Sequence, residues 1–437
     1  MITKPSFFLL LFVVVSCPAL LCAEAVDRIP VLTLDDCIAA VLADNPQIAA
    51  SRAELARRRA VGNGVRKDLY PTLSGQYAYL HQPDAMILPG EQFSYGLVAE
   101  QPLYRGRALV TAVRQADLAV ETAASDLEEK INSLVYEVHL RYYELLRTTK
   151  QTEDAVQAVL RLQSHVRDAR AFYEAGLIPK NDMLQSEVEL AQGEQDLVDA
   201  ETRLTLAQAR LNMLMQRPVD TPLQVSDPAK VSFPEPSWQN AVREALARRP
   251  EMSRAEREIV MAENDIILKK APYLPSVSLS ASYERMGDEV GGAPYSHGPH
   301  EVKTIKAMAS WKLWTWRQDR DEVIAAKENL TKTKELAATI RNEVTLDVRD
   351  AFLRLQQAEK RIAVTEKAIE HARENYRINK AQYQVQLATS TAVLDAQTLL
   401  TRAMTNYHDA LYDYYLAVAA LDRAKGAFAT LSKTQNE

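Results

Sequence analysis

The chain has 437 residues, a quarter of them charged, and a formal net charge of −6 at pH 7. This acidic balance gives no support for nucleic-acid binding, which calls for a basic face. The sequence contains no Walker glycine loop, no dinucleotide-binding fingerprint and no clustered metal ligands. It therefore predicts neither an enzyme nor a cofactor or metal site.

The first residues have the pattern of a secretory signal peptide. An apolar run of about ten residues follows Lys4 and leads to small residues around Ala25, so we expect residues 1–25 to be removed. Cys17 lies in a loose lipoprotein-type cleavage box, in which it would be lipidated. We favour ordinary cleavage, because a proline follows this cysteine and a suitable site lies further on. Cys37 would then be the one remaining cysteine, without a partner for an intramolecular disulfide.

The first half of the mature chain predicts long helices that flank two short strands. Stretches free of glycine and proline are typical of long helices, whereas Leu73, Tyr77 and Tyr79 alternate with polar residues at the period of a strand. A loop containing two prolines separates the two strands. The predicted elements are helices over residues 34–68, 107–175 and 180–216 and strands near 72–81 and 93–103.

A proline-rich segment without periodicity, residues 218–237, links this half to a second one. The run 318–425 has neither glycine nor proline, and one helix of that length would approach roughly 160 Å. We expect it to fold back within 386–391, where small and β-branched residues interrupt the helix formers. The predicted elements are helices over 238–270, 318–387 and 390–425, strands near 276–285 and 303–313, and a C-terminal tail over 427–437.

The two halves are copies of one structural unit. A shift of 210 residues places Tyr173 on Tyr383, and an earlier block matches at a shift of 204, with Pro71 on Pro275. The offset changes within the loop between the two strands, so the order of elements is the same in both copies. The first repeat spans residues 26–217 and the second spans residues 238–426.

The helix lengths supply a rule for assembly. The shorter helices are about half as long as the long ones, so two of them stacked end to end equal one long helix. Two long helices and two stacked pairs predict a bundle of four columns, roughly 100 Å tall, whose strands all leave from one end. A seven-residue stripe that includes Val348, Leu355 and Ile362 has the spacing of a coiled coil.

Four strands of about ten residues, apolar on one face and polar on the other, have the pattern of outer-membrane barrel strands. They cannot close a barrel alone, because an open edge in lipid leaves backbone groups unsatisfied. Closure requires eight strands from a dimer or twelve from a trimer, and the pattern does not choose between them. The aromatic girdle expected at the strand bases consists of Tyr70, Tyr104, Tyr273, Trp311, Trp314 and Trp316.

The order helix, strand, strand, long helix, short helix, present twice, resembles the TolC-type outer-membrane efflux proteins over nearly the whole mature chain. Short motifs match at residues 69–73 and 273–277 before the strands and at 101–104 and 311–314 after them. The resemblance implies a mainly helical fold with membrane β-strands. It also implies a homotrimer whose twelve strands form one outer-membrane barrel, continued by a periplasmic helical tunnel. The implied partners are a periplasmic adaptor protein and an inner-membrane pump.

The resemblance also assigns candidate residues at the closed end of the tunnel. Asp395 matches an acidic position that rings the narrow end, and Tyr383 matches a gate tyrosine. Ala392 and Ala388 stand where a second acid and a basic partner are often found, so a double acidic ring and that polar link are not expected. Without the resemblance, Asp395 is an ordinary solvated carboxylate. The hairpin turns where an adaptor would dock include Gly176, Leu177, Asp182, Leu387 and Ser390.

We therefore expect a passive outer-membrane channel of a tripartite efflux or type I secretion system, which carries drugs, metals or secreted polypeptides. A partner would supply the energy. The alternative is a periplasmic coiled-coil scaffold or adhesin, in which the strands form a small soluble sheet with one face on a helix. The two hypotheses differ in whether the protein is a trimer extracted by detergent from outer membranes or a soluble monomer.

Overall fold

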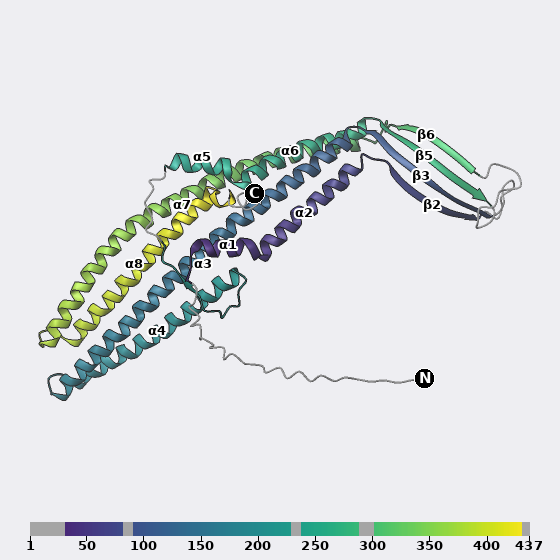
Figure 1. Ribbon diagram of the computed structural model, residues 1–437. Coiled ribbons are helices and arrows are strands. Elements are labelled where there is room, and N and C mark those ends of the chain that lie inside the picture. Colours follow the sequence, from purple (N-terminus) through teal and green to yellow (C-terminus); the bar gives the residue numbers. More distant parts are fainter. Residues whose placement is uncertain (1–30, 82–90, 229–236, 288–300, 431–437) are drawn as a thin grey trace, which may run out of the picture.

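The computed structural model describes residues 31–81, 91–228, 237–287 and 301–430. The predicted signal peptide, Cys17 and the last seven residues of the predicted tail lie outside the described residues. The described part is elongated, with a four-stranded sheet at one end and two helical hairpins that end at the other (Figure 1). The predicted mainly helical fold class with strands is confirmed, and the trimeric barrel stays a prediction.

The first repeat is built around one long helix. α3 (Ala108–Glu174) has 67 residues and runs from the sheet to the far end, where α4 (Lys180–Leu214) turns back along it. The other elements of this half are β1 (Val31–Leu32), α1 (Leu34–Asp44), α2 (Pro46–Lys67), β2 (Thr72–His81) and β3 (Glu91–Arg105).

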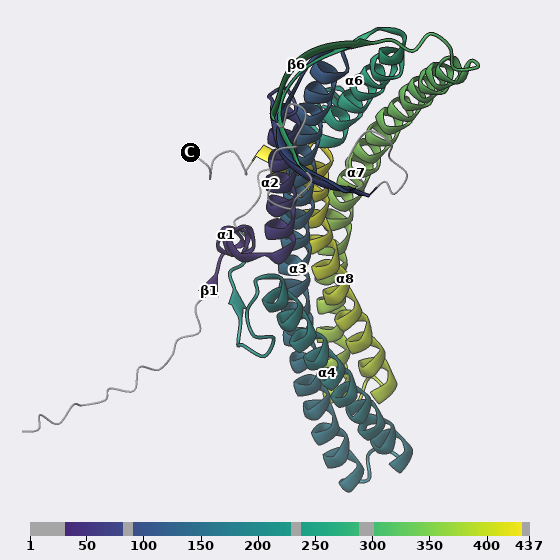
Figure 2. The ribbon, with the colours of Figure 1, turned by 90° about the vertical axis from the view of Figure 1, so that its right-hand side faces the viewer.

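The second repeat follows the same order with equal helix lengths. α7 (Gln318–Gln384) also has 67 residues, and α8 (Ser390–Ala424), like α4, has 35. Both hairpin tips therefore lie at the same end of the body, away from the sheet (Figures 1 and 2). The remaining elements are β4 (Gln224–Val225), α5 (Trp238–Arg248), α6 (Pro250–Lys270), η1 (Ala271–Tyr273), β5 (Ser276–Gly287), β6 (Glu301–Ser310) and η2 (Ala427–Thr430).

Helices in four columns build the body. α3 packs against α2 near the sheet and against α4 near the tip, and α7 packs in the same manner against α6 and α8. The two repeats meet where α3 contacts α8 and α6. Apolar side chains fill one core around Val138 and Tyr142 and another around Val348 and Leu421. The long helices thus carry the core, and the shorter helices cover them.

The first helix of each repeat is broken in two, so the single-helix predictions over 34–68 and 238–270 are wrong. Asn45 has an extended backbone with ψ of 123°, because the ring of the following proline disfavours the α conformation. Pro46 then starts α2, where its missing N–H leaves no hydrogen bond unmade. The same break occurs at Arg249, which also precedes a proline and has ψ of 129°.

The strands form one antiparallel sheet in the order β2-β3-β5-β6. Its register keeps apolar residues on one face, with Leu97 opposite Tyr283 and Ala281 opposite Ile305. The outer edges of β2 and β6 pair with no strand among the described residues, and every residue of β2 is exposed. The protomer therefore offers an exposed apolar face and two open edges.

Three strands differ in extent from their predictions, and one of them is β5, which continues to Gly287, two residues beyond the predicted 276–285. β3 is two residues longer at each end than the predicted 93–103, and a bulge leaves Leu103 without an opposite residue. β6 ends at Ser310, three residues earlier than predicted. Trp311 lies beyond the strand, and its indole N–H donates to the Tyr273 carbonyl at 3.1 Å. The chain then turns toward α7.

The segment 218–237 is more than a link between the repeats. Its strand β4 pairs in parallel with β1 near the start of the first repeat. Tyr142 on α3 donates its hydroxyl hydrogen to the Ser226 carbonyl at 2.6 Å. The sequence did not predict this strand, because two residues are too few to show a period of two. The segment fastens the start of the first repeat to α3.

Both long helices end in the same hydrogen-bonded turn. Leu177 and Leu387 each donate their N–H to the carbonyl five residues earlier, at 2.8 Å, which is the closure of a Schellman motif. This closure needs a left-handed residue before each leucine. Gly176, with φ of 73°, fills the position in the first hairpin, and Gln386, with φ of 61°, fills it in the second. Glycine adopts this conformation without strain, whereas glutamine does not.

We expect Gln386→Gly to stabilise the second tip by about 1 kcal/mol, because glycine removes the strain of the left-handed position. The matched change Gly176→Gln should destabilise the first tip by a similar amount. Amide hydrogen exchange measures both effects: the exchange of Leu387 should slow in the first variant, and that of Leu177 should accelerate in the second. Unchanged amide exchange rates in both variants would contradict the assignment of strain to these positions.

Candidate functional site

A buried polar cluster, which we call the tip joint, connects the two hairpins behind their tips. The hydroxyl of Ser390, the first residue of α8, lies 2.7 Å from Nε2 of His165 on α3. It also lies 3.0 Å from the hydroxyl of Ser186 on α4, which in turn donates to the Asp182 carbonyl at 2.9 Å. These hydrogen bonds tie the second hairpin to both helices of the first.

Tyr383, predicted as a gate residue, is buried in the tip joint. Its ring centroid lies 4.8 Å from that of His165 and 5.4 Å from that of Phe172, both on α3. Burial raises the pKa of Tyr383, and the nearby Ser390 hydroxyl opposes this shift. The structure thus places the tyrosine between the hairpins of one protomer rather than on an open surface.

His165 is neutral in the tip joint at neutral pH. Burial lowers its pKa, the Asp168 carboxylate opposes this shift, and the Lys380 ammonium group adds to it. A neutral imidazole can donate from one ring nitrogen and accept at the other. It therefore suits a buried site shared with the hydroxyl of Ser390, which also donates or accepts.

The predicted docking residues differ in exposure. Leu177 is 54% exposed and Leu387 is 80% exposed, at equivalent places in the two turns. Gly176 is exposed and Asp182 is half-buried. Ser390 is buried by its contacts in the tip joint, so its side chain is not available to a partner. Each hairpin tip therefore presents one exposed leucine at the end of the body.

Asp395 lies on the exposed side of α8, which it shares with Leu399 and Arg402, whereas its neighbours Leu394 and Ala396 are buried. This exposure leaves its carboxylate free to face water or another copy of the chain. The structure does not bring the two predicted aperture residues into one environment, because the tyrosine of the pair is buried and the aspartate is exposed.

All six aromatic residues of the predicted girdle are exposed. Tyr273 accepts the hydrogen bond from Trp311, and the rings of Trp314 and Trp316 meet edge to face at a centroid distance of 5.9 Å. Tyr70 and Tyr104 lie at the bases of the neighbouring strands. Amphipathic rings at this level suit a boundary between an apolar and an aqueous phase.

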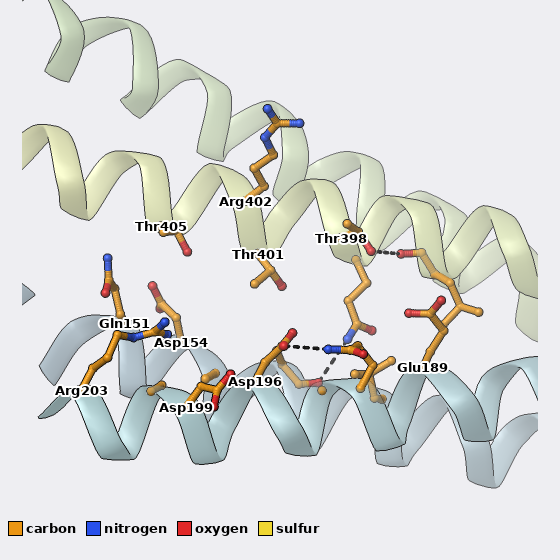
Figure 3. Close-up of a pocket in the computed structure, with 18 residues that line it drawn as sticks. Gln151, Asp154, Glu189, Asp196, Asp199, Arg203, Thr398, Thr401, Arg402 and Thr405 are labelled. Atoms are coloured by element: carbon orange, nitrogen blue, oxygen red, sulfur yellow. Dashed lines mark hydrogen bonds between the residues drawn. The ribbon is translucent and has the colours of Figure 1, made fainter. Parts of the chain in front are cut away.

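A cavity of about 540 Å³, the acidic cavity, lies between α3, α4 and α8 on the sheet side of the tip joint (Figure 3). Asp154, which is buried, lies 3.2 Å from the His408 imidazole. The other charged groups on the walls are more exposed. They are Glu189, Asp196, Asp199, Arg203 and Arg402. The excess of carboxylates gives the cavity a negative potential that attracts cations.

Sequence reasoning missed both the tip joint and the acidic cavity. His165 stands beside Val166, which matches a stripe position of the second repeat at the shift of 210, and a polar residue next to such a stripe is a weak signal. Its partner Ser390 is 225 residues away in the chain. The pair can be found only once the packing of the two hairpins is known.

Other functional signals are limited in the described ranges. There, no group of three histidine, cysteine or carboxylate side chains is arranged to hold a metal ion. Cys37 is buried in the core, and burial raises the pKa of its thiol to about 12. Within the same ranges, no helix combines the length and apolar character needed to cross a bilayer.

Comparison with known families decides the class of this chain. Residues 37–215 and 241–427 match the family model described as outer membrane efflux protein. The chain belongs to the outer membrane efflux protein family. The two matched segments coincide with the two structural repeats, and the predicted family and outer-membrane location are confirmed.

A curated relative carries a related description. The pyoverdine export outer membrane protein OpmQ of Pseudomonas aeruginosa is 26% identical over 199 residues, which make up 42% of this chain. The matched stretch spans 39% of OpmQ, less than half the length of that protein.

Solved structures of outer-membrane channels share the fold over most of the chain. OprN has a TM-score of 0.80 at 19% identity, with 90% of this chain and 89% of OprN covered. CmeC of Campylobacter jejuni has a TM-score of 0.80 at 14% identity, over 92% of this chain and 88% of CmeC. VceC of Vibrio cholerae has a TM-score of 0.79 at 16% identity, over 90% and 96%. At these identities the likeness establishes the fold.

For this family member we expect acid to loosen the tip joint. Burial lowers the pKa of His165 in the folded chain, so the unfolded segment binds the proton first, and stability is lost as pH falls below about 6.5. Hydrogen exchange of amides 383–392, corrected for the intrinsic rate, should be faster at about pH 5.5 than at about pH 7.5.

The variant His165→Gln keeps a hydrogen-bonding side chain but removes the titration, so this pH dependence should disappear. His371→Gln, at an exposed position of α7, is the matched control and should retain it. An unchanged pH response in His165→Gln would assign the effect to another group.

Proposed function

We propose that this protein is the outer-membrane channel of a tripartite efflux or type I secretion system. In this proposal it is a passive trimeric duct without chemistry of its own, opened by a periplasmic adaptor and an inner-membrane pump. Family membership supports the proposal. The observation that carries it is the sheet, whose four antiparallel strands have an exposed apolar face and two edges without a partner in the described chain.

The exposed face of the sheet suits lipid. Ile305 is 83% exposed and Leu73 is 73% exposed, although both are large and apolar. The opposite face carries small polar residues such as Ser278 and Ser280. Apolar residues that alternate with polar ones along a strand are what a barrel with lipid outside and water inside requires.

Closure of the sheet favours a trimer. In lipid, unpaired backbone N–H and C=O groups are unfavourable by several kcal/mol each, so β2 must pair with β6 of the next copy. Three copies with four strands each give a twelve-stranded barrel that leaves an aqueous passage. Two copies would give eight strands and a lumen filled by side chains, which is too narrow for a duct.

The helical body offers a matching interface. α3 and α8 form the contact between the hairpins, so α4 and α7 are left on the two flanks of the protomer. Both flanks carry exposed apolar residues at helical spacing. They are Leu184, Val188 and Val198 on α4 and Leu346, Leu353 and Val364 on α7. Packing of α4 from one copy on α7 of the next would cover both sets and continue the barrel as a tunnel.

At the tip end, we assign the aperture to Asp395 and the closed arrangement to the tip joint. Three Asp395 carboxylates around one axis would give the narrow end a negative potential that attracts cations. Tyr383 and His165 would hold the hairpins together in the closed state. An adaptor that binds at Leu177 and Leu387 more tightly in the open state would shift the equilibrium toward opening.

The second candidate function is a periplasmic coiled-coil scaffold or adhesin with a small soluble sheet. The heptad spacing and the long helical body favour it. The sheet argues against it, because an apolar face and open edges in water promote aggregation. We therefore rank the channel above the scaffold.

The channel proposal is tested on the protein extracted from outer membranes with detergent. We expect a trimer that forms cation-preferring channels in planar bilayers. Asp395→Asn removes the carboxylates at the aperture, so cation selectivity should fall and block by divalent cations should weaken several-fold. Asp220→Asn, which removes an exposed carboxylate outside the helices, is the matched control and should conduct like the wild type.

Two outcomes would overturn parts of this proposal. A soluble monomer without conductance would support the scaffold. A conducting trimer in which Asp395→Asn keeps its selectivity and block would remove this residue from the aperture.

Adaptor docking at the tips is tested by cross-linking in cells. A thiol-reactive cross-linker on Leu177→Cys or Leu387→Cys should capture a periplasmic adaptor, identified by mass spectrometry, because both positions are exposed at the end of the body. Val260→Cys, exposed on α6 in the half nearer the sheet, is the control and should capture none. Equal capture from all three positions, or none from the tips, would contradict docking there.

A further inference from the structure

A second cavity, of about 360 Å³, lies where the sheet meets the helical body. The end of β3, the first turns of α3 and Leu69, which lies before β2, form its walls. The basic lining residues are Arg105, Arg107 and Arg114, and the apolar ones include Leu69, Tyr104 and Val110. None of the residues that line this basic cavity is acidic.

The three arginines are exposed, and their guanidinium groups are unpaired among the described residues. None of them forms an ion pair or a side-chain hydrogen bond with another described residue. The first turn of α3, which begins here, contains no acidic residue, and no side chain caps its N–H groups. Like charges that share one cavity repel each other. An anion placed among them is therefore stabilised by all three.

The equivalent place in the second repeat has a different set of charged residues. Arg317 is equivalent to Arg107 and has the same φ of 72° before a helix of the same length. There, however, the first turn of α7 contains Asp319. Its carboxylate lies 3.5 Å from Lys312 Nζ and accepts a hydrogen bond from Thr315 at 2.7 Å. The aspartate pairs with Lys312, which stands where the first repeat has Pro102, and Thr315 and Ile324 stand where it has Arg105 and Arg114. Only the first repeat therefore gathers three arginines at this place.

The basic cavity lies beside the apolar face of the sheet. Gln101 is opposite Leu279 and Tyr104 is opposite Val277, so both belong to the face that carries the exposed apolar residues. The bulge at Leu103 keeps Tyr104 on this face, and Leu103 itself is 57% exposed. A ligand can therefore place an anionic group among the arginines and an apolar chain along the sheet.

We propose that the basic cavity binds the phosphate of an anionic phospholipid at the boundary between the membrane and the helical body. The planar fork of arginine donates two parallel hydrogen bonds to phosphate oxygens, and the apolar wall accepts an acyl chain. This site rests on the membrane placement of the sheet and is independent of the exported cargo. One lipid per protomer would hold the sheet at a defined depth in the bilayer.

Native mass spectrometry tests this site on the protein in mixed micelles that contain equal amounts of dioleoyl-phosphatidylglycerol and dioleoyl-phosphatidylcholine. The wild type should retain the anionic lipid in preference to the zwitterionic one by roughly tenfold. Arg107→Gln combined with Arg114→Gln should bring this ratio close to one. Arg317→Gln removes a charge at the equivalent position of the second repeat and should keep the preference. Arg114→Gln alone, away from the left-handed turn, should lower the ratio in part.

Three results would overturn the proposal. They are a wild type that does not discriminate between the two lipids, an equal loss of preference in Arg317→Gln, and displacement of the anionic lipid by millimolar inorganic phosphate, which would assign the cavity to free phosphate. Bilayer conductance of the same preparations reports on the channel separately. A protein that conducts but shows no lipid preference would overturn the lipid site and leave the channel intact.

Discussion

In the proposed channel, the need to satisfy backbone hydrogen bonds in lipid is the constraint on which the rest of the structure depends. A sheet of four strands with an apolar face and open edges cannot persist there as one copy. The strands of both repeats must therefore emerge at the same end and in one sheet, which the central pairing of β3 with β5 achieves. The helices continue the same geometry, because equal lengths of α3 and α7 carry both hairpin tips to the end of the body away from the sheet.

The sequence was sufficient to predict the order of the elements, their duplication and the one apolar face of the sheet, because each of these produces a local periodicity. It was insufficient where a short segment depends on distant contacts. The breaks at Asn45 and Arg249 come from the prolines that follow them, but a proline near a helix start can also kink a helix without ending it. β4 consists of two residues, and its pairing with β1 leaves no pattern in the sequence.

The turns at the hairpin tips could be predicted from the sequence, whereas the buried contacts of the tip joint could not. Gly176 and the exposed leucines of the tips follow from local turn chemistry. The tip joint depends on how α3 faces α8, so His165 and Ser390 meet across 225 residues with no local sign of it. The copies also differ where duplication alone would make them equal: Gln386 stands where the first repeat has a glycine, and Lys312 and Asp319 form an ion pair where the first repeat has arginines without an acidic residue.

The matched helix lengths also restrict how such a chain can change in evolution. An insertion of one heptad in α3 keeps its apolar stripe in register with the partner helices, but it shifts the first tip by about 10 Å relative to the second unless α4, α7 and α8 lengthen as well. Shorter insertions would also rotate the apolar seam away from its partner helix. Taller or shorter descendants of this architecture should therefore arise by coordinated gains or losses of seven residues in both hairpins, and single unmatched insertions should be confined to the loops.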